Sequence, residues 1–175
     1  MYRAVTLHCM RKGFVSGSKI DRSALAADLN NISVDFVYNP ETDGFETYLN
    51  SENVEQEIRS IEVTSNVSLV SQVAVVRERM VELQRKIGMS KGIVMDGRDI
   101  GTVVFPDADL KIFMTASADI RARRRFDELK AKGLDVDYEN IRRDIIARDI
   151  ADENRDISPL RRAEDAVLLD NSRMS

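Results

Sequence analysis

The residues best suited to chemistry lie in one short run, Asp96-Gly97-Arg98-Asp99. It places a guanidinium between two carboxylates, directly after the apolar residues Ile93-Val94-Met95, and Gly97 allows a tight turn and the close approach of a ligand. In such a run, Arg98 would hold a phosphate while Asp99 accepts hydrogen bonds from an amino group. An Asp-Gly turn with local salt bridges would use the same residues, so the run alone leaves a binding site and a structural turn open.

Arginine is unusually frequent in the second half of the chain. Of the 26 basic residues 19 are Arg, and eleven of these lie between Arg121 and Arg173. Arginine's rigid planar group binds phosphate or carboxylate oxygens bidentately, whereas lysine acts as a point charge. Because the net charge is −4, we expect a focused anion site rather than a broad surface for nucleic acid. The alternative is a solvated helix face with partners such as Arg124 and Glu128.

Composition narrows the class of protein. The chain has 175 residues, 43% of them apolar and 32% charged, which is typical of one folded domain and excludes a disordered or collagen-like chain. The only cysteine, Cys9, cannot form an internal disulfide, and it and the only histidine, His8, fit packing better than metal binding. No apolar run approaches the ~20 residues of a membrane span, so we expect a cytoplasmic protein without a membrane partner.

The first half of the chain alternates between two periodicities. Helical patterns cover residues 2–11, with Gly13 closing the helix, then 21–31, 54–58 and, as one long helix, 67–87. Between them, Ile32, Val34, Phe36 and Tyr38 alternate with other residues, and the same period returns after the turn-forming residues 39–44. This pattern predicts a β-hairpin.

The second half of the chain indicates βα units. Short apolar runs at 93–95, 110–114 and 166–169 end at the polar residues Asp96, Thr115 and Asp170, and helical patterns cover 118–132 and 138–152. Such alternation predicts an α/β protein with a parallel sheet. Ligands in these folds bind at the carboxyl ends of the strands, where the polar residues lie.

These residues carry a resemblance to a known family. The run from Ile93 to Phe113, followed by Ser117-Ala118-Asp119-Ile120-Arg121-Ala122-Arg123-Arg124-Arg125, resembles the bacterial cytidylate kinases, which are nucleoside monophosphate kinases. The resemblance spans essentially the whole chain, from Met1-Tyr2-Arg3-Ala4 to Leu169-Asp170-Asn171-Ser172. It implies a transferase of pyrimidine nucleotide metabolism that converts ATP and CMP or dCMP to ADP and CDP or dCDP. It also implies Mg²⁺ with the ATP, a monomer, and no nucleic-acid partner.

The resemblance assigns roles to residues that match the family's motifs. It implies that the CMP phosphate, the cytosine base, the sugar and the transferred phosphoryl group each have their own side chains, with Arg98, Arg148 and Arg155 as the catalytic group. The implied sets are Arg3 and Arg98 for the CMP phosphate; Ser68, Arg77 and Asp99 for cytosine; Arg148 and Asp152 for the sugar and adjoining phosphate; Arg121, Arg124 and Arg155 for the lid; and Asp96 for magnesium, through water.

The resemblance also implies a fold: a P-loop-kinase-like parallel sheet with flanking helices, lacking the family's first two strands. We expect a single domain over 1–175, truncated at both ends, with an antiparallel monophosphate-binding insert at 28–66 and a helical lid at 121–157. The family's Gly-x-x-x-x-Gly-Lys motif does not occur, because Gly13, Gly17 and Lys19 have a different spacing.

The missing motif leaves alternatives to an active kinase. Without this cradle for the ATP phosphates, we expect the 175-residue chain to be inactive by itself. One alternative is a non-catalytic remnant that binds CMP. The other is an Arg-rich RNA-binding module, which the negative net charge disfavours.

Overall fold

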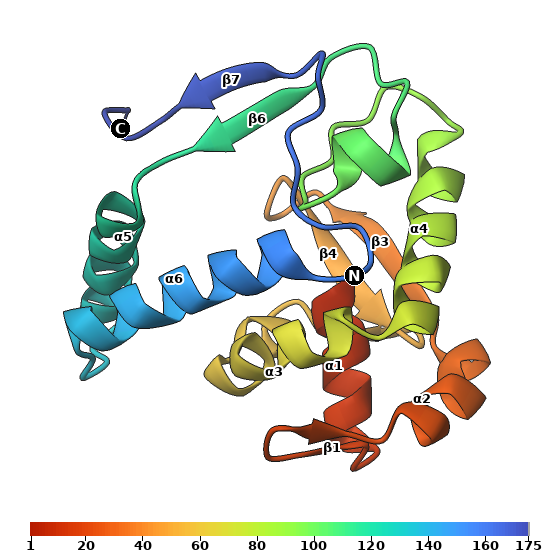
Figure 1. Cartoon of the computed structure of the whole chain (residues 1–175). Coiled ribbons are helices and arrows are strands. Elements are labelled where there is room, and N and C mark those ends of the chain that lie inside the picture. The colour runs from red at the N-terminus through yellow and green to blue at the C-terminus, as the bar shows by residue number, and fades with distance from the viewer. Residues whose placement is uncertain (175) are drawn as a thin grey trace. The chain divides into compact units, whose positions relative to one another are not determined.

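The computed structural model describes residues 1–174 and has a mixed α/β architecture with small sheets and several helices (Figure 1). The chain divides into two compact units, Met1–Ile87 and the residues from Gly88 onward. The first unit contains α1 (Tyr2–Arg11), β1 (Val15–Ser16), β2 (Lys19–Ile20), α2 (Arg22–Asp28), η1 (Leu29–Asn31), β3 (Val34–Asn39), β4 (Gly44–Leu49), β5 (Glu52–Asn53), η2 (Glu57–Arg59), α3 (Ile61–Ser71) and α4 (Ala74–Gly88).

Helix α1 is the centre of the first unit. Its residues from Ala4 to Cys9 are all buried, which is expected of a helix that other elements cover on every side. In Figure 1, α1 lies between α3 and the hairpin of β3 and β4, and it packs against both. The core around it is formed by aliphatic side chains, among them Leu25, Val54, Val70 and Met80.

The predicted hairpin is confirmed. Strands β3 and β4 pair antiparallel from Val34 opposite Leu49 to Asn39 opposite Gly44, and β5 adds a short third strand in the order β3-β4-β5. Paired residues share one face of the sheet. At the Val34–Leu49 end this face is buried in the core of the unit.

The second unit contains η3 (Ile100–Val104), β6 (Ile112–Thr115), α5 (Ala118–Ala131), α6 (Tyr138–Asn154) and β7 (Val167–Asp170). Strands β6 and β7 pair in parallel, with Thr115 opposite Asp170 at their carboxyl ends. Helices α5 and α6 pack against each other. These four elements confirm the predicted strands at 110–114 and 166–169 and the two predicted helices within one or two residues.

The predicted strand at Ile93-Val94-Met95 is wrong. These residues form no strand in the described chain, and the Val94 side chain is fully exposed. A strand requires partners for its backbone N–H and C=O groups, and neither β6 nor β7 pairs with this run among the described residues. An apolar run therefore predicts a strand only where a neighbour pairs with it.

The predicted long helix at 67–87 is also wrong, because it is divided into α3 and α4 at Gln72 and Val73. The Arg77 guanidinium donates to the Ser71 carbonyl over 3.1 Å and so pairs a carbonyl that the break leaves without a helical donor. The predicted helix at 54–58 is reduced to one turn, closed by the Ile58 N–H donating to the Val54 carbonyl, followed by η2.

Candidate functional site

The Asp96–Asp99 run leads into an unusually wide helical turn. In η3 the Phe105 N–H donates to the Ile100 carbonyl over 2.7 Å, which is the five-residue spacing of a π-helix, a form that often marks functional sites. Gly97 is required here, because a Cβ at this position would lie 2.8 Å from the Ile100 side chain. The turn places the buried carboxylate of Asp99 at the start of η3.

Asp152 on α6 is the centre of a cluster of charged side chains, which we call the Asp152 cluster: Arg98, Asp99, Arg148, Asp152 and Arg155. The Arg98 Nε donates to Asp152 Oδ2 over 2.8 Å, and Arg148 Nε lies 3.9 Å from the same oxygen. Arg155 lies 3.6 Å from Asp152 Oδ1 and 3.9 Å from Asp99 Oδ1. The spacing of 148, 152 and 155 places these three residues on one face of the helix and its end.

The Asp152 cluster has three cations for two carboxylates, so it has an excess positive charge. The Arg155 side chain is 7% exposed, while those of Arg98 and Arg148 are 45% and 42% exposed. Burial, and after it the like charge of Arg98, lowers the pKa of Arg148. An anion bound beside Arg98 and Arg148 would relieve this repulsion, and two adjacent guanidinium groups suit the oxygens of a phosphate.

The other two predicted lid arginines make structural contacts. Arg121 binds Asp149 bidentately, over 3.0 and 2.6 Å, and thereby joins α5 to α6. Arg124 donates to the Asn171 side chain and to the carbonyls of Asn171 and Met174. Glu128 accepts hydrogen bonds from Arg125 and Lys132. The Arg-rich helix α5 is thus partly a scaffold held by ion pairs.

The predicted site residues of the first unit are held by backbone and hydroxyl groups. Arg3 on α1 donates to the Ile58 carbonyl over 2.9 Å and to the Thr64 hydroxyl over 2.8 Å. Arg77 on α4 is 2% exposed, and its guanidinium lies 5.5 Å from the centre of the Tyr2 ring. Both side chains therefore have fixed positions within the unit.

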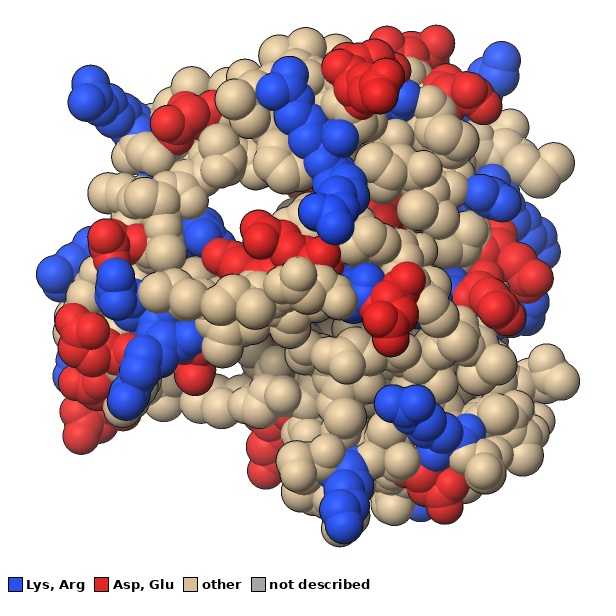
Figure 2. Space-filling model, in the orientation of Figure 1, with Lys and Arg blue, Asp and Glu red and all other residues tan. Residues whose placement is uncertain are grey.

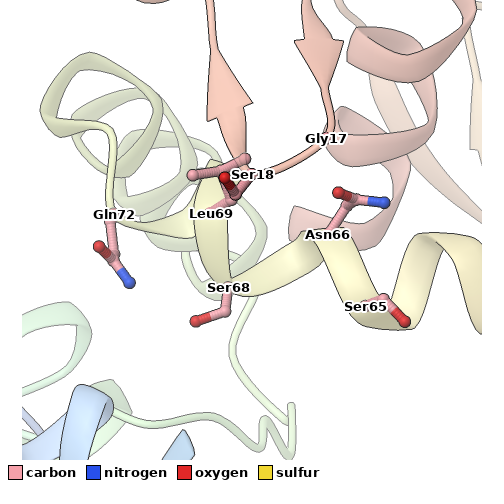
Figure 3. A pocket seen from close by; sticks show the side chains of 7 residues that line it. All are labelled: Gly17, Ser18, Ser65, Asn66, Ser68, Leu69 and Gln72. Carbon is pink, nitrogen blue, oxygen red and sulfur yellow. The ribbon is translucent and has the colours of Figure 1, made fainter.

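Ser68 lines a shallow pocket of about 450 Å³ in the first unit. The pocket lies between α3 and the turn that joins β1 and β2, and Figure 3 shows the Ser68 hydroxyl pointing away from that turn. Its lining has hydroxyl and amide groups and no charged side chain: Gly17, Ser18, Ser65, Asn66, Ser68, Leu69 and Gln72. Such a lining suits neutral hydrogen-bonding groups.

Asp96, the predicted magnesium residue, is exposed in the loop before Gly97. Residues 1–174 contain no group of three or more histidine, cysteine or acidic side chains placed to hold a metal ion. Magnesium bound to nucleotide phosphates keeps several waters and needs only one or two carboxylates, so a lone Asp96 fits that chemistry.

None of the described helices is both long and apolar enough to cross a membrane.

Sequence reasoning assigned no role to Asp149 and Asn171, which hold Arg121 and Arg124. Their partners lie 28 and 47 residues away, so no local pattern could have identified them.

Charged side chains of both signs are interspersed on the surface. Over the face of the described residues drawn in Figure 2, Lys and Arg side chains lie next to Asp and Glu side chains.

Comparison with known proteins gives a consistent result. The family model described as cytidylate kinase matches residues 1–175. The cytidylate kinase of Phocaeicola vulgatus is 55% identical over 175 residues, which are 100% of this chain and 76% of that protein. The cytidylate kinases of Bacteroides thetaiotaomicron and Parabacteroides distasonis are 54% and 53% identical over the same shares of each chain.

Proposed function

Because this chain belongs to the cytidylate kinase family, a family of phosphotransferases, we propose that it serves the transfer of the γ-phosphoryl group from ATP to CMP or dCMP. The products are ADP and CDP or dCDP. The observation that carries the proposal is the Asp152 cluster, in which two partly exposed arginines lie beside buried carboxylates. Reactions of this class depend mainly on positioning and on the neutralisation of phosphate charge.

Arg98 and Arg148 are the groups that the cluster offers to phosphate. We assign Arg98, together with Arg3, to the CMP phosphate, and Arg148 with Asp152 to the sugar and the adjoining phosphate. Asp152 accepts hydrogen bonds, as ribose hydroxyls require, and it also orients Arg98. The Arg98 guanidinium binds Asp152 through Nε, so its two terminal nitrogens are the ones directed to ligand oxygens.

Ser68, Arg77 and Asp99 are the proposed readers of cytosine. A hydroxyl, a guanidinium and a carboxylate satisfy the carbonyl, ring nitrogen and exocyclic amine of that base. Arg77 and Asp99 are 2% and 6% exposed, so the surrounding protein holds both side chains in place. Buried polar groups discriminate strongly, since a base that leaves them unpaired loses their hydrogen bonds and bears their desolvation.

Arg155, Arg121 and Arg124 are the proposed lid arginines, which neutralise charge on the transferred phosphoryl group. Arg155 and Arg121 have carboxylate partners on α6, and Arg124 has neutral ones. Magnesium, held through water by Asp96, would neutralise charge on the ATP phosphates when it is bound.

The finer features of the fold belong to the same proposal. Parallel pairing of β6 and β7, with Thr115 and Asp170 at their carboxyl ends, supports a P-loop-kinase-like sheet. The β3–β5 sheet falls within the proposed monophosphate-binding insert at 28–66, and α6 falls within the proposed lid at 121–157. We further propose that the protein is a cytoplasmic monomer.

Calorimetric titration of the 175-residue chain with CMP, UMP and AMP tests the nucleotide site. We expect CMP to bind most tightly, and Arg98→Ala to weaken CMP binding by about 10–100-fold through the loss of a charged hydrogen bond. Arg161→Ala, on an exposed side chain of the same unit, is the matched control and should leave binding unchanged. Equal binding of the three nucleotides would contradict the assignment.

A further inference from the structure

The β3–β5 sheet lies in the most acidic part of the chain. Residues 23–58 contain no lysine, arginine or histidine and have eight acidic side chains: Asp28, Asp35, Glu41, Asp43, Glu46, Glu52, Glu55 and Glu57. The whole chain has a net charge of only −4. The acidity is therefore local: this segment has a charge of −8, and the rest of the chain, with a net charge of +4, offsets half of it.

The eight carboxylates divide into two groups. Four outside the β3–β4 hairpin pair with arginine or histidine side chains of the first unit: Asp28 binds His8, Glu52 and Glu57 bind Arg11, and Glu55 binds Arg59. The four on the hairpin have only neutral hydrogen-bond partners or none among the described contacts. Asp35 accepts from Ser33, Asp43 from Tyr38, and Glu46 from Asn39 and Asn53. The hairpin consequently has negative charge that no basic side chain in residues 1–174 is shown to pair with.

Large apolar side chains are exposed beside these carboxylates. Phe36, Tyr38 and Phe45, which we call the hairpin ledge, are 40%, 50% and 67% exposed. The register places all three on the face of the sheet that is buried at the Val34–Leu49 end, so the ledge is the uncovered continuation of the core face. The Tyr38 and Phe45 rings meet edge to face at 5.6 Å, and the Tyr38 hydroxyl donates to Asp43 over 2.7 Å. These contacts fix the two rings.

Strand β3 is an edge of its sheet. In the order β3-β4-β5 it pairs only with β4, so one side of its backbone is open among the described residues. Its residues Asp35, Phe36, Val37 and Tyr38 are exposed. An open edge of six residues is long enough to accept an extended segment as a further strand.

We propose that the free edge of β3 and the hairpin ledge bind an extended segment of another protein that is rich in arginine and lysine. Backbone groups of the segment would pair with β3, its cations would meet Asp35, Glu41 and Asp43, and an arginine would lie on the Tyr38 and Phe45 rings. A second copy of this chain is disfavoured, because two uncompensated acidic edges repel each other. The same charge repels the phosphates of nucleic acid and anionic lipid.

The test uses a fluorescein-labelled peptide of alternating arginine and valine, long enough to pair with β3, and the full 175-residue chain. Fluorescence anisotropy gives the affinity, and ¹H–¹⁵N spectra of the labelled protein show which amides respond. We expect saturable binding, shifts concentrated on β3 and the hairpin ledge, and about tenfold weaker binding by Phe45→Ser or Asp35→Lys. Glu164→Lys, the same charge change at an exposed site of the second unit, should leave the affinity unchanged.

Other results would overturn the proposal. A peptide N-methylated at every second residue cannot complete the strand pairing, so undiminished binding of that peptide would reduce the interaction to charge alone. Absence of binding, an unchanged affinity in Phe45→Ser, or tighter binding of an oligouridylate would each refute it. Concentration-dependent dimerisation that Phe45→Ser abolishes would identify a second copy as the occupant instead. The exposed position of Phe45 makes this variant compatible with folding, and retained spectral dispersion of the core amides verifies it.

Discussion

Asp152 accepts a hydrogen bond from Arg98, the residue that we assign to the substrate phosphate. This contact has a cost as well as a benefit. The bond from Arg98 Nε fixes the side chain before a ligand arrives, which reduces the entropy lost on binding. It also brings Arg98 close enough to Arg148 to contribute to the lowered pKa of Arg148. A phosphate that binds both guanidinium groups would remove that repulsion, so the cluster favours an anion without needing to rearrange.

Asp99→Ala tests whether this carboxylate reads the base. We expect the apparent affinity for CMP to fall about 10–100-fold more than that for ATP, because one charged hydrogen bond to cytosine is lost. The backbone carbonyl of Asp99, which accepts the Val103 and Val104 N–H groups, is retained in the variant. Steady-state kinetics with each substrate varied, in an active protein that contains this chain, provide the comparison.

Asp109→Ala, in an exposed loop of the same unit, is the control for Asp99→Ala and should change neither constant. Equal losses for CMP and ATP in Asp99→Ala would assign Asp99 a structural role.

Cys9 is expected to be inert in the folded protein. Its side chain is completely buried, and burial raises the pKa of the thiol to about 11. Since only the thiolate reacts, modification by a disulfide reagent at pH 8 should be at least about 100-fold slower than in urea. Absorbance of the released thiol measures both rates, and equal rates would show that α1 is accessible. Because Cys9 is the only cysteine, the signal has one source.

At the scale of elements, α1 ends in a hydrogen-bonded cap that depends on Gly13. The Phe14 N–H donates to the Cys9 carbonyl and the Gly13 N–H to the Met10 carbonyl, while Gly13 has φ +72°. A Cβ at Gly13 would meet no atom within 4 Å, so substitution is penalised through the backbone alone. Gly13→Ala should lower the free energy of unfolding by about 1–2 kcal/mol.

Urea denaturation measures the effect of Gly13→Ala. Gly13→Asn should lose less stability, since asparagine adopts positive φ more readily. Lys12→Ala, one residue earlier at φ −86°, is the matched control and should be close to neutral. A large loss in the control and none at Gly13 would contradict the proposed cap.

The contact between α1 and α2 predicts a pH dependence. Asp28 accepts hydrogen bonds from Asn31 and from His8 Nε2, and these, in that order, lower the pKa of Asp28 below its usual 3.8. A carboxyl whose pKa is lowered on folding stabilises the fold above pH ~4, and this contribution is lost as the pH falls through the pKa of the folded state. Asp28→Asn should therefore destabilise the chain at pH 6.

The difference between wild type and Asp28→Asn should shrink as the pH falls below 3.8. Urea denaturation at pH 6 and pH 3 makes the comparison, with Asp127→Asn, at an exposed position on α5, as the control. A difference that grows on acidification would show that the hydrogen bonds do not favour the ionised carboxyl.

The elements that the sequence predicted correctly are those whose pattern is local. Apolar residues at every second position predict β3 and β4, and apolar residues at helical spacing predict α1, α5 and α6. One wrong prediction concerns a feature that depends on distant partners, because Ile93-Val94-Met95 has the composition of a strand but pairs with no other strand in the described part of the chain. The other is local: the apolar spacing continues across Gln72 and Val73 without a glycine or proline to mark the break, and Arg77 binds the Ser71 carbonyl beside it.

The candidate site shows the same division. The family resemblance named Arg98, Asp99, Arg148, Asp152 and Arg155 as site residues in separate roles, and their contacts around Asp152 became visible only in the structure. The sequence did not predict that Arg121 is bound by Asp149 or that Arg124 is bound by Asn171, since these contacts arise only when α5 packs on α6 and beside the end of β7.

At the scale of the whole molecule, the described residues have more groups for a phosphate acceptor than for a phosphate donor. The Asp152 cluster supplies arginines that suit the acceptor, and the proposed lid arginines Arg121 and Arg124 are engaged in contacts of their own. Transfer also requires the β- and γ-phosphates of ATP to be held in line with the acceptor. In kinases of this class, backbone N–H groups and a lysine within Gly-x-x-x-x-Gly-Lys perform that task, and residues 1–175 do not contain the motif.

We therefore expect the 175 residues alone to have no measurable CMP kinase activity while they retain CMP binding. Loss of a single contact to transition-state charge lowers the rate by about 10²–10³-fold, and residues 1–175 lack the whole motif that holds the ATP phosphates. The measurement is a coupled assay of ADP release, comparing the chain alone with the chain joined to the part of Phocaeicola vulgatus cytidylate kinase that lies outside the matched residues. Activity in the joined protein only, abolished by Arg98→Ala and unaffected by Arg161→Ala, would place the acceptor site in this chain and the donor site in the added segment. Comparable turnover by the chain alone would require an ATP site built from residues 1–175. The arginines of the second unit that make no described contact, Arg161 first among them, would then be the residues to substitute.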